Sequence, residues 1–343
     1  MRAVVIHPPH DLRVEDYTLA DPGPGQLRIA IRAGGICGSD LHYYQHGGFG
    51  TVRVKHPMVL GHEVAGIIDA IGPGVTGLAP GQAVAVNPSL PCGTCTFCQS
   101  GEQQHCLEMR FYGSAMRDPH VDGGFREALV CEATQAVPLP EGLDTTTAAF
   151  AEPLSVCLHA VRQAGPLLGK RVLVTGAGPI GALTIAAARL AGAREIIATD
   201  LTTAPEKTAR AMGADRFIAV GGTTDALAAF TARKGYFDVA FEASGSGPAL
   251  LGILPVLRPR GTIVQIGIGG DVPVPMSMLA AKEITWRGTF RFHEEFTLAV
   301  ETLARRAIDV APLLTAQFPI DRAAEAFALA ADRSRAMKVQ LTF

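Results

Sequence analysis

The run VLVTGAGPIG, from Val172 to Gly181, sets the architecture of the second half of this chain. An apolar, β-branched run leads into Gly176, Gly178 and Gly181, and these three glycines have the G-x-G-x-x-G spacing. The first permits a tight turn, the second lets the backbone approach a pyrophosphate, and the third lets helix and strand pack closely. Because the following helix also presents free amide donors at its N-terminus, the motif predicts a dinucleotide site. Taken alone, such a spacing can also be an ordinary glycine-rich turn.

An acidic residue supports the dinucleotide interpretation. The next predicted strand, EIIATD, ends at Asp200, about 20 residues after the glycines, where a carboxylate can bind a ribose 2′-hydroxyl. The same carboxylate would repel a 2′-phosphate, so NAD is favoured, while Lys207 leaves NADP possible. The candidate cofactor residues are Gly176, Gly178, Pro179, Ile180, Gly181, Asp200, Ser244 and Gly267.

The pattern on either side of this motif predicts two domains. Residues 146–288 alternate short apolar strands with alanine-rich helices, which is typical of a parallel sheet covered on both faces. Residues 1–145 are rich in glycine, proline and short β-branched runs, and they predict an irregular, mostly β domain. Residues 289–343 predict two helices and a final strand, KVQLTF, and we expect them to pack back onto the first domain.

Composition excludes several classes of function. The chain has 343 residues, 48% of them hydrophobic and 18% charged, with a net charge of -2. That balance predicts large cores and no nucleic-acid or membrane partner, because no long basic run is present. The N-terminal apolar stretch is too short for a signal peptide, so we expect a cytoplasmic protein.

Four of the seven cysteines lie close together. Their spacing is C-x2-C-x2-C-x7-C, and the residues are Cys92, Cys95, Cys98 and Cys106. Four thiolates at this spacing can close a tetrahedral shell around a structural zinc ion. Unmetallated cysteines or a redox centre are the alternatives. Cys131 and Cys157 have no partners at metal spacing, and we assign them to packing.

A second set of possible ligands is dispersed. The loop-like stretch from Cys37 to Glu63 begins with a thiol and ends with His62 and Glu63, and Glu152 follows in the AEP tripeptide. Three protein ligands and an open position are typical of a catalytic zinc. Singly, each residue can equally be a buried or hydrogen-bonded structural group, and spacing alone leaves the choice open.

Several motifs together carry a resemblance to a known family. GHEVAGIIDAIGPGV resembles the zinc signature of the medium-chain alcohol dehydrogenases, and GGICGSDLH, the four-cysteine lobe and GAGPIG extend the similarity over essentially the whole chain. Loop segments such as CGSDLHYYQHGGFG resemble the polyol branch. The resemblance implies an α/β protein in which a GroES-like, mostly β catalytic domain is joined to a Rossmann domain with a doubly wound parallel sheet. It also implies two Zn²⁺ ions per chain and NAD.

The resemblance also implies roles for individual residues. Cys37 and His62 would bind the catalytic zinc, Glu63 or Glu152 would complete its shell, and Ser39 and His42 would carry a proton outward. Tyr43, with Tyr44 and His46 beside it, would contact a polyhydroxylated substrate. The candidate groups for a substrate carboxylate are Arg110, Arg117, His120 and Arg291.

The expected reaction is reversible hydride transfer between NAD and a secondary alcohol of a sugar acid. The expected substrate is L-idonate, oxidised to 5-dehydro-D-gluconate, and the alternative is a neutral polyol of the sorbitol or L-iditol type. The resemblance further implies a homodimer or homotetramer. A non-catalytic nucleotide-binding protein is disfavoured because it would not need an open zinc site.

Overall fold

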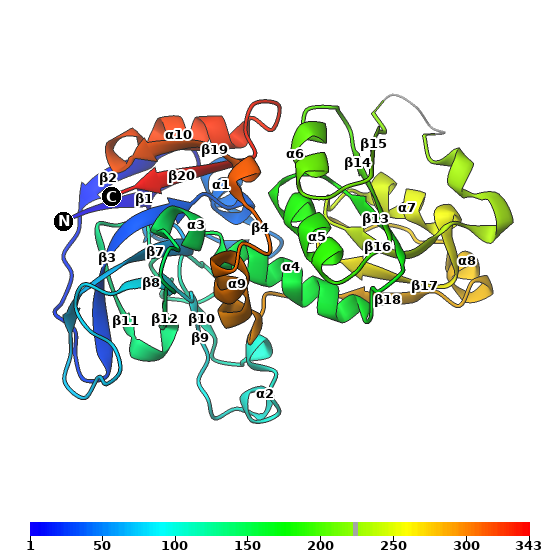
Figure 1. Cartoon of the computed structure of the whole chain (residues 1–343). Helices are drawn as coiled ribbons and strands as arrows, with labels where there is room; N and C mark the ends of the chain where they lie inside the picture. Colours follow the sequence, from blue (N-terminus) through cyan, green and yellow to red (C-terminus); the bar gives the residue numbers. More distant parts are fainter. Residues whose placement is uncertain (222–225) are drawn as a thin grey trace. The chain divides into compact units, whose positions relative to one another are not determined.

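The computed structural model describes residues 1–221 and 226–343 and consists of two compact units (Figure 1). The first contains Met1–Glu152, Phe296–Arg306 and Leu314–Phe343, and the second contains Pro153–Glu295 and Ala307–Leu313. The sequence-based limits at 145 and 288 fall a few residues before these boundaries, and they did not anticipate the short return of the chain to the second unit.

The second unit is built on one parallel sheet of six strands. The strands are β13 Arg171–Thr175, β14 Glu195–Asp200, β15 Arg216–Ala219, β16 Phe237–Glu242, β17 Leu257–Gln265 and β18 Thr285–Gly288. They lie in the order β15-β14-β13-β16-β17-β18, so the order reverses between β13 and β16. This is the doubly wound arrangement, in which a dinucleotide binds at the carboxyl ends of the strands beside that reversal. The expected α/β class is confirmed.

Helices cover both faces of this sheet (Figure 1). They are α4 Ala151–Ala164, α5 Pro179–Leu190, α6 Glu206–Ala211, α7 Gly247–Val256 and α8 Met276–Ala281. Helix α5 follows the glycine motif and is apolar on nearly all sides, with every residue from Gly181 to Ala188 buried. Its alanines and its third glycine let it lie close against the strands, and this fixes the helix N-terminus at the predicted cofactor edge.

The first unit is mostly β. Its strands form one seven-stranded sheet and three smaller sheets, and the apolar core lies among them. The seven-stranded sheet contains β3 Gln26–Gly35, β7 Glu63–Ile71, β8 Ala83–Val86, β11 Ala128–Glu132, β12 Ala136–Pro138, β19 Leu314–Pro319 and β20 Lys338–Thr342. The smaller sheets contain β1 Arg2–Ile6, β2 Leu12–Asp16, β4 Gly48–Phe49, β5 Val52–Arg53, β6 Met58–Val59, β9 Ser89–Leu90 and β10 Arg110–Phe111. The helices are α1 Gly38–His46, α2 Thr96–Gln99, α3 Thr145–Ala148, α9 Glu295–Ala304 and α10 Ala323–Ala331.

The C-terminal strand is part of the central sheet of this unit. β20 pairs antiparallel with β3 and parallel with β19, so the last residues of the chain lie beside some of its first. Phe125, Phe327 and Leu341 pack in the core beneath this junction, and each is fully buried. The β3–β20 pairing therefore brings the C-terminus beside the candidate metal ligands that follow β3 and begin β7.

One local expectation was wrong. The stretch after Cys37 is the helix α1 rather than a loop, and it ends at Gly47, whose φ of 66° lies in the left-handed region. The error arose because α1 has no apolar periodicity: it buries only Asp40 and Tyr43. Further along the chain, α3 and α4 are separate helices, broken between Ala148 and Ala151.

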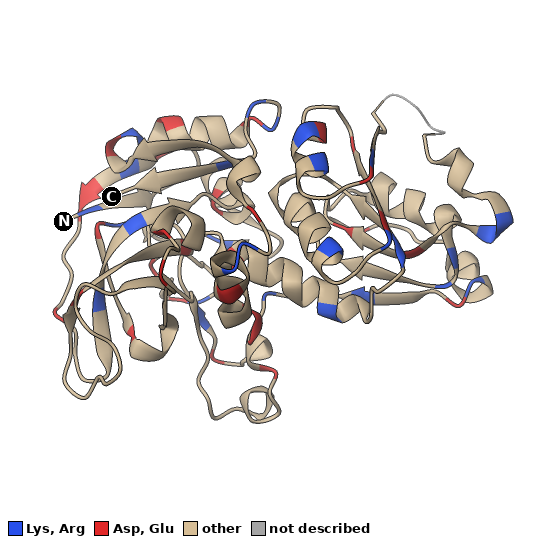
Figure 2. Ribbon diagram, in the orientation of Figure 1, with Lys and Arg blue, Asp and Glu red and all other residues tan. Residues whose placement is uncertain are grey.

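Charged side chains of both signs are spread over both units (Figure 2). Acidic and basic segments are interspersed along the ribbons of both units (Figure 2). Within the described residues, no helix combines the length and apolar character that a membrane span requires.

Candidate active site, cofactor site and metal centres

Cys37, His62 and Glu63 form a compact group of metal-binding donors in the first unit. One donor atom from each lies within 4.8 Å of the others. The sheet register explains their meeting: Gly35, near the end of β3, pairs with Glu63, the first residue of β7, and Cys37 follows two residues later. Gly35 is required here, because a Cβ at this position would lie 2.1 Å from a Glu63 carboxylate oxygen. A thiol, an imidazole and a carboxylate are the donor set that zinc takes in catalytic sites.

Asp40 orients this group, and sequence reasoning missed it. Its Oδ2 accepts a hydrogen bond from the Cys37 amide at 2.9 Å, and its Oδ1 accepts one from the Gly61 amide at 3.2 Å. The first bond belongs to a capping box at the start of α1. His62 Nδ1 lies 3.8 Å from the same carboxylate, and it is buried without a hydrogen-bond partner among the described residues. A buried imidazole nitrogen left in this way suits a site that binds a cation.

Glu63 is paired with a buried lysine that sequence reasoning also missed. Lys338 Nζ donates to both Glu63 oxygens, at 2.8 and 2.7 Å, and to the Ile36 carbonyl at 3.1 Å. The side chains are 3% and 1% exposed. Burial alone would lower the pKa of Lys338, but the nearby Glu63 and Cys37 outweigh it and raise that pKa. The lysine is therefore a fixed positive charge beside the donor group.

Glu152, the remaining acid, is buried beside this group but does not join the three donors within 4.8 Å. Burial raises the pKa of Glu152 to about 8, against the lowering effect of His62. Desolvation likewise raises the pKa of the Cys37 thiol to about 11. Both groups therefore hold protons unless a cation is present, and a divalent metal ion would favour their ionised forms. The residues present fit a zinc ion.

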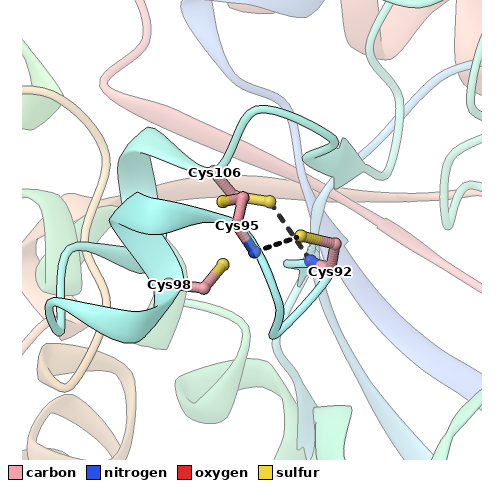
Figure 3. Close-up of side chains that lie close together, drawn as sticks. All are labelled: Cys92, Cys95, Cys98 and Cys106. Carbon is pink, nitrogen blue, oxygen red and sulfur yellow. Dashed lines mark hydrogen bonds between the residues drawn. The ribbon is translucent and has the colours of Figure 1, made fainter.

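The four clustered cysteines form a second donor group, shown in Figure 3. Backbone amides point at their sulfurs: the Cys92 amide donates to Cys106 Sγ at 3.1 Å, and the Cys95 amide donates to Cys92 Sγ at 3.4 Å. Hydrogen bonds, first of all from the Thr94 backbone, lower the pKa of Cys92 to about 6. The apolar core of this lobe is small and contains Cys98, Cys106, Met109 and Phe111. Because half of that core is cysteine, a metal ion would supply most of its cohesion.

The glycine motif has the geometry that dinucleotide binding requires. Gly176 has a φ of 82°, and a Cβ there would lie 2.8 Å from the Ser244 backbone. A Cβ at Gly181 would lie 1.8 Å from the Gly176 carbonyl oxygen, whereas one at Gly178 would meet nothing within 4 Å. The first and third glycines are thus required by packing, and the second leaves open space at the N-terminus of α5.

The other cofactor candidates lie at the same edge of the sheet. Asp200 ends β14, and its carboxylate accepts hydrogen bonds from the amides of Ala177 at 2.8 Å and Leu201 at 2.7 Å. Each oxygen keeps a further acceptor position for a ribose hydroxyl. Ser244 and Gly267 follow β16 and β17, where a Cβ on Gly267 would lie 2.1 Å from the Gly245 amide nitrogen. Cys157, assigned to packing, contacts the Ile180 carbonyl from α4.

Comparison with known proteins establishes the family. Residues 23–141 match the alcohol dehydrogenase GroES-like domain, and residues 179–305 match the zinc-binding dehydrogenase domain. The chain belongs to the zinc-dependent medium-chain dehydrogenases. It is 47% identical to the L-idonate 5-dehydrogenase (NAD(P)⁺) of Escherichia coli K12 over 92% of this chain and 91% of that protein. The crystal structure of an E. coli K-12 L-idonate 5-dehydrogenase superposes with a TM-score of 0.95, covering 100% of this chain and 98% of the other at 44% identity. The sorbitol dehydrogenase of Gallus gallus is 36% identical, over 95% of this chain and 92% of that enzyme.

This medium-chain dehydrogenase uses a nicotinamide cofactor, as its family and its NAD(P)⁺-dependent relative show. The structure gives three of the expected substrate residues, Tyr43, Arg117 and His120, hydrogen bonds to backbone groups. Tyr43 is 1% exposed, and its hydroxyl accepts a hydrogen bond from the Ala115 amide, so its ring belongs to the core. Arg117 donates to the carbonyls of Met109 and Leu107, and it therefore braces the cysteine lobe.

His120, like Arg117, is held by hydrogen bonds to backbone groups. One ring nitrogen lies 2.8 Å from the Arg117 carbonyl, and the other accepts a hydrogen bond from the Lys55 amide at 2.8 Å. Both nitrogens are thus engaged with backbone. Arg110 is exposed on β10. Arg291, in the second unit, has a φ of 54°, and its guanidinium lies 5.0 Å from the Phe290 ring centroid.

Replacing the buried lysine tests the ion pair. Lys338→Met should lower the free energy of unfolding of the metal-free protein by about 3–5 kcal/mol, because Glu63 is left charged and buried without its partner. Denaturant titration in the presence of a chelator measures this. Adding Glu63→Gln to the same chain should recover most of the loss, and a single variant as stable as the parent would contradict the assignment.

Removing one cysteine tests the lobe. Cys106→Ser should reduce the zinc content from two ions per chain, one for each donor group, to one. The lobe should then be cut by proteases near the cysteines, because little apolar core remains to hold it. Metal analysis and limited proteolysis measure both effects. Cys131→Ala, at a buried cysteine outside both groups, should keep both ions.

Two alanine substitutions test the glycine motif. Gly181→Ala should lower the melting temperature of the protein by several degrees, since its Cβ would overlap the Gly176 carbonyl. Gly178→Ala has space and should leave the melting temperature unchanged, yet weaken NADH binding about tenfold or more, because its methyl group stands where the pyrophosphate approaches. Thermal melts and NADH titration separate the two. A Gly178→Ala protein that binds NADH as the parent does would refute this placement.

Proposed function

We propose that this protein oxidises L-idonate at C5 to 5-dehydro-D-gluconate, reversibly, with a nicotinamide cofactor. The observation that carries the proposal is the 47% identity to an L-idonate 5-dehydrogenase over nearly the whole chain, against 36% to a sorbitol dehydrogenase. A neutral polyol is the alternative substrate, because those enzymes share the same fold family. The zinc and cofactor residues do not separate the two, so substrate contacts must.

In this proposal Cys37, His62 and Glu63 hold the catalytic zinc, because their donor atoms already converge. When bound, the ion acts as a Lewis acid that lowers the pKa of the substrate alcohol. Lys338 balances the charge of Glu63 and holds its carboxylate in place. In the same proposal Glu152 lies beside these three residues and is not itself a ligand of the zinc ion. The four cysteines of the lobe bind the structural zinc.

Proton transfer to solvent is assigned to Ser39 and His42, both on α1. Ser39 supports this role because its side chain lowers the pKa of the Cys37 thiol, against the larger effect of burial, and so lies near that sulfur. His42 lies on the exposed side of the helix. Desolvation, together with His46 and Arg333, lowers the pKa of His42, so the imidazole is neutral near pH 7 and can accept a proton.

For the cofactor we propose a preference for NAD, carried by Asp200, whose carboxylate disfavours a 2′-phosphate. For the substrate carboxylate we propose Arg291. Arg117 and His120 are engaged with backbone groups, and Arg110 is the remaining candidate. An arginine suits this role because its guanidinium can bind a carboxylate with two parallel hydrogen bonds.

We also propose a cytoplasmic homodimer or homotetramer. The edge strand β18 supports association, because all four of its residues are exposed and Trp286 is 38% exposed. An uncovered edge of this kind offers unpaired backbone groups to a second chain.

The decisive assay follows cofactor reduction with L-idonate and with sorbitol, each with NAD and with NADP. L-Idonate should give a kcat/KM at least about a hundredfold above that for sorbitol, since the site would hold a carboxylate that sorbitol lacks. Preference for sorbitol would replace L-idonate with the alternative substrate. Activity with neither would overturn both assignments.

Two arginine variants sharpen this assay. Arg291→Leu should raise KM for L-idonate about tenfold or more and leave KM for any residual sorbitol oxidation nearly unchanged, because only the aldonate loses a charged partner. Arg110→Leu is the matched control and should change neither value by more than about twofold. Equal effects of Arg291→Leu on both substrates would remove Arg291 from the carboxylate site.

A further inference from the structure

Glu242 is a buried carboxylate that the proposed chemistry does not use. It is the last residue of β16 and is 0% exposed. The sheet register pairs it with Thr175, which ends β13, and with Gln265, which ends β17. It therefore lies at the carboxyl edge of the sheet, beside the reversal of strand order between β13 and β16. Dinucleotides bind outside this edge in doubly wound sheets.

Five donors surround this carboxylate. Oε1 accepts from the Ser244 amide at 2.8 Å, from the Ser244 hydroxyl, and from the Thr175 hydroxyl at 3.4 Å. Oε2 accepts from the Gln265 side-chain amide at 2.6 Å and from the Gly245 backbone amide at 3.1 Å. All five donors are neutral groups. The carboxylate is thus held by oriented neutral dipoles, and the backbone and side-chain amides among them require an acceptor at their positions.

The donors come from the last residues of β13 and β17 and from the loop after β16, and the loops that follow these three strands pack backbone against backbone. A Cβ on Gly176 would lie 2.8 Å from Ser244, and a Cβ on Gly267 would lie 2.1 Å from the Gly245 amide and 2.8 Å from Glu242 itself. The Gly245 carbonyl similarly leaves no room for a Cβ on Gly269, which would approach it to 2.3 Å. These loops therefore leave little room for a change in their backbone positions. The hydrogen bonds of Glu242 connect the three strand ends from which the loops start.

We propose that Glu242 is the positioning residue for the nicotinamide half of the cofactor. In a doubly wound sheet each half binds one mononucleotide. The half built on β13 to β15 carries the glycine motif and Asp200, which suit the pyrophosphate and the adenosine ribose. The half built on β16 to β18 then takes the nicotinamide mononucleotide. Glu242 fixes the two loops of that half, after β16 and β17, against the loop after β13.

The test measures binding of NADH and of 5′-AMP to the purified enzyme with both zinc ions retained and no substrate present. Glu242→Gln replaces one acceptor oxygen with an NH₂ group, which must face donors on either side. NADH affinity should fall about tenfold, whereas 5′-AMP, which occupies only the adenosine half, should compete within about twofold of its original affinity. Because no alcohol is involved, the result does not depend on which substrate the enzyme oxidises.

Two contrasting variants make the outcome specific. Asp200→Ala should weaken 5′-AMP and NADH together, since it removes a contact of the adenosine half. Glu295→Gln removes another buried carboxylate of the second unit, which contacts His159 and Arg162, and it should leave both affinities within about twofold. If Glu242→Gln weakens 5′-AMP as much as NADH, or weakens neither, the proposal is wrong.

A milder variant covers the case in which Glu242→Gln does not fold. Gln265→Met removes one donor and keeps the carboxylate with its other four partners. NADH affinity should then fall by about threefold with 5′-AMP unchanged, because one charge-assisted hydrogen bond is lost and the loop after β17 is loosened. An unchanged NADH affinity, or an equal fall for 5′-AMP, would likewise refute the positioning role.

Discussion

The buried ion pair between Lys338 and Glu63 is the interaction on which the metal centre depends. Lys338 opens the last strand of the chain, and its ammonium joins β20 to the start of β7 and to the carbonyl of Ile36 beyond β3. A buried ion pair stabilises a fold little more than an apolar pair of the same shape would. Removing only one partner, however, lowers the free energy of unfolding strongly, because a buried charge is left unpaired. Its value here is positional: it fixes a carboxylate beside Cys37 and His62, and it does so only when the C-terminal strand is in place.

The second unit was predictable from sequence because its signals are local. A β-branched run, three glycines at fixed spacing and an acid at the end of the next strand specify one strand–turn–helix–strand unit, and the structure has it. Helix α1 was missed for the opposite reason. It is polar, and its start depends on the capping box between Cys37 and Asp40, a signal that periodicity does not show. Strand β19, another element missed, pairs with β20 and becomes recognisable only through that partner.

The residues of the candidate site also fall into those that the sequence could predict and those that it could not. Residues in compact motifs, such as the four cysteines, were found from spacing alone. Lys338 was not, because 275 positions separate it from Glu63 and nothing in KVQLTF marks its lysine as buried. Glu242 could not be predicted either, since it ends an apolar strand and its donors come from two other strands and from the loop after its own. The burial of Tyr43 was not predictable either, because a tyrosine near a metal ligand in sequence can point its ring into the core or away from it.

The two buried carboxylates illustrate different solutions to one electrostatic problem. Cys37, Glu63 and Glu152 can together carry three negative charges, and Lys338 supplies one positive charge, so the group lacks the two that a divalent ion brings. Without Lys338 the metal centre would retain an excess anion in a poorly solvated place. At Glu242 a cation would be a disadvantage, because it would stand beside the loops that must receive a positively charged nicotinamide ring. Neutral donors hold that carboxylate without adding positive charge beside those loops.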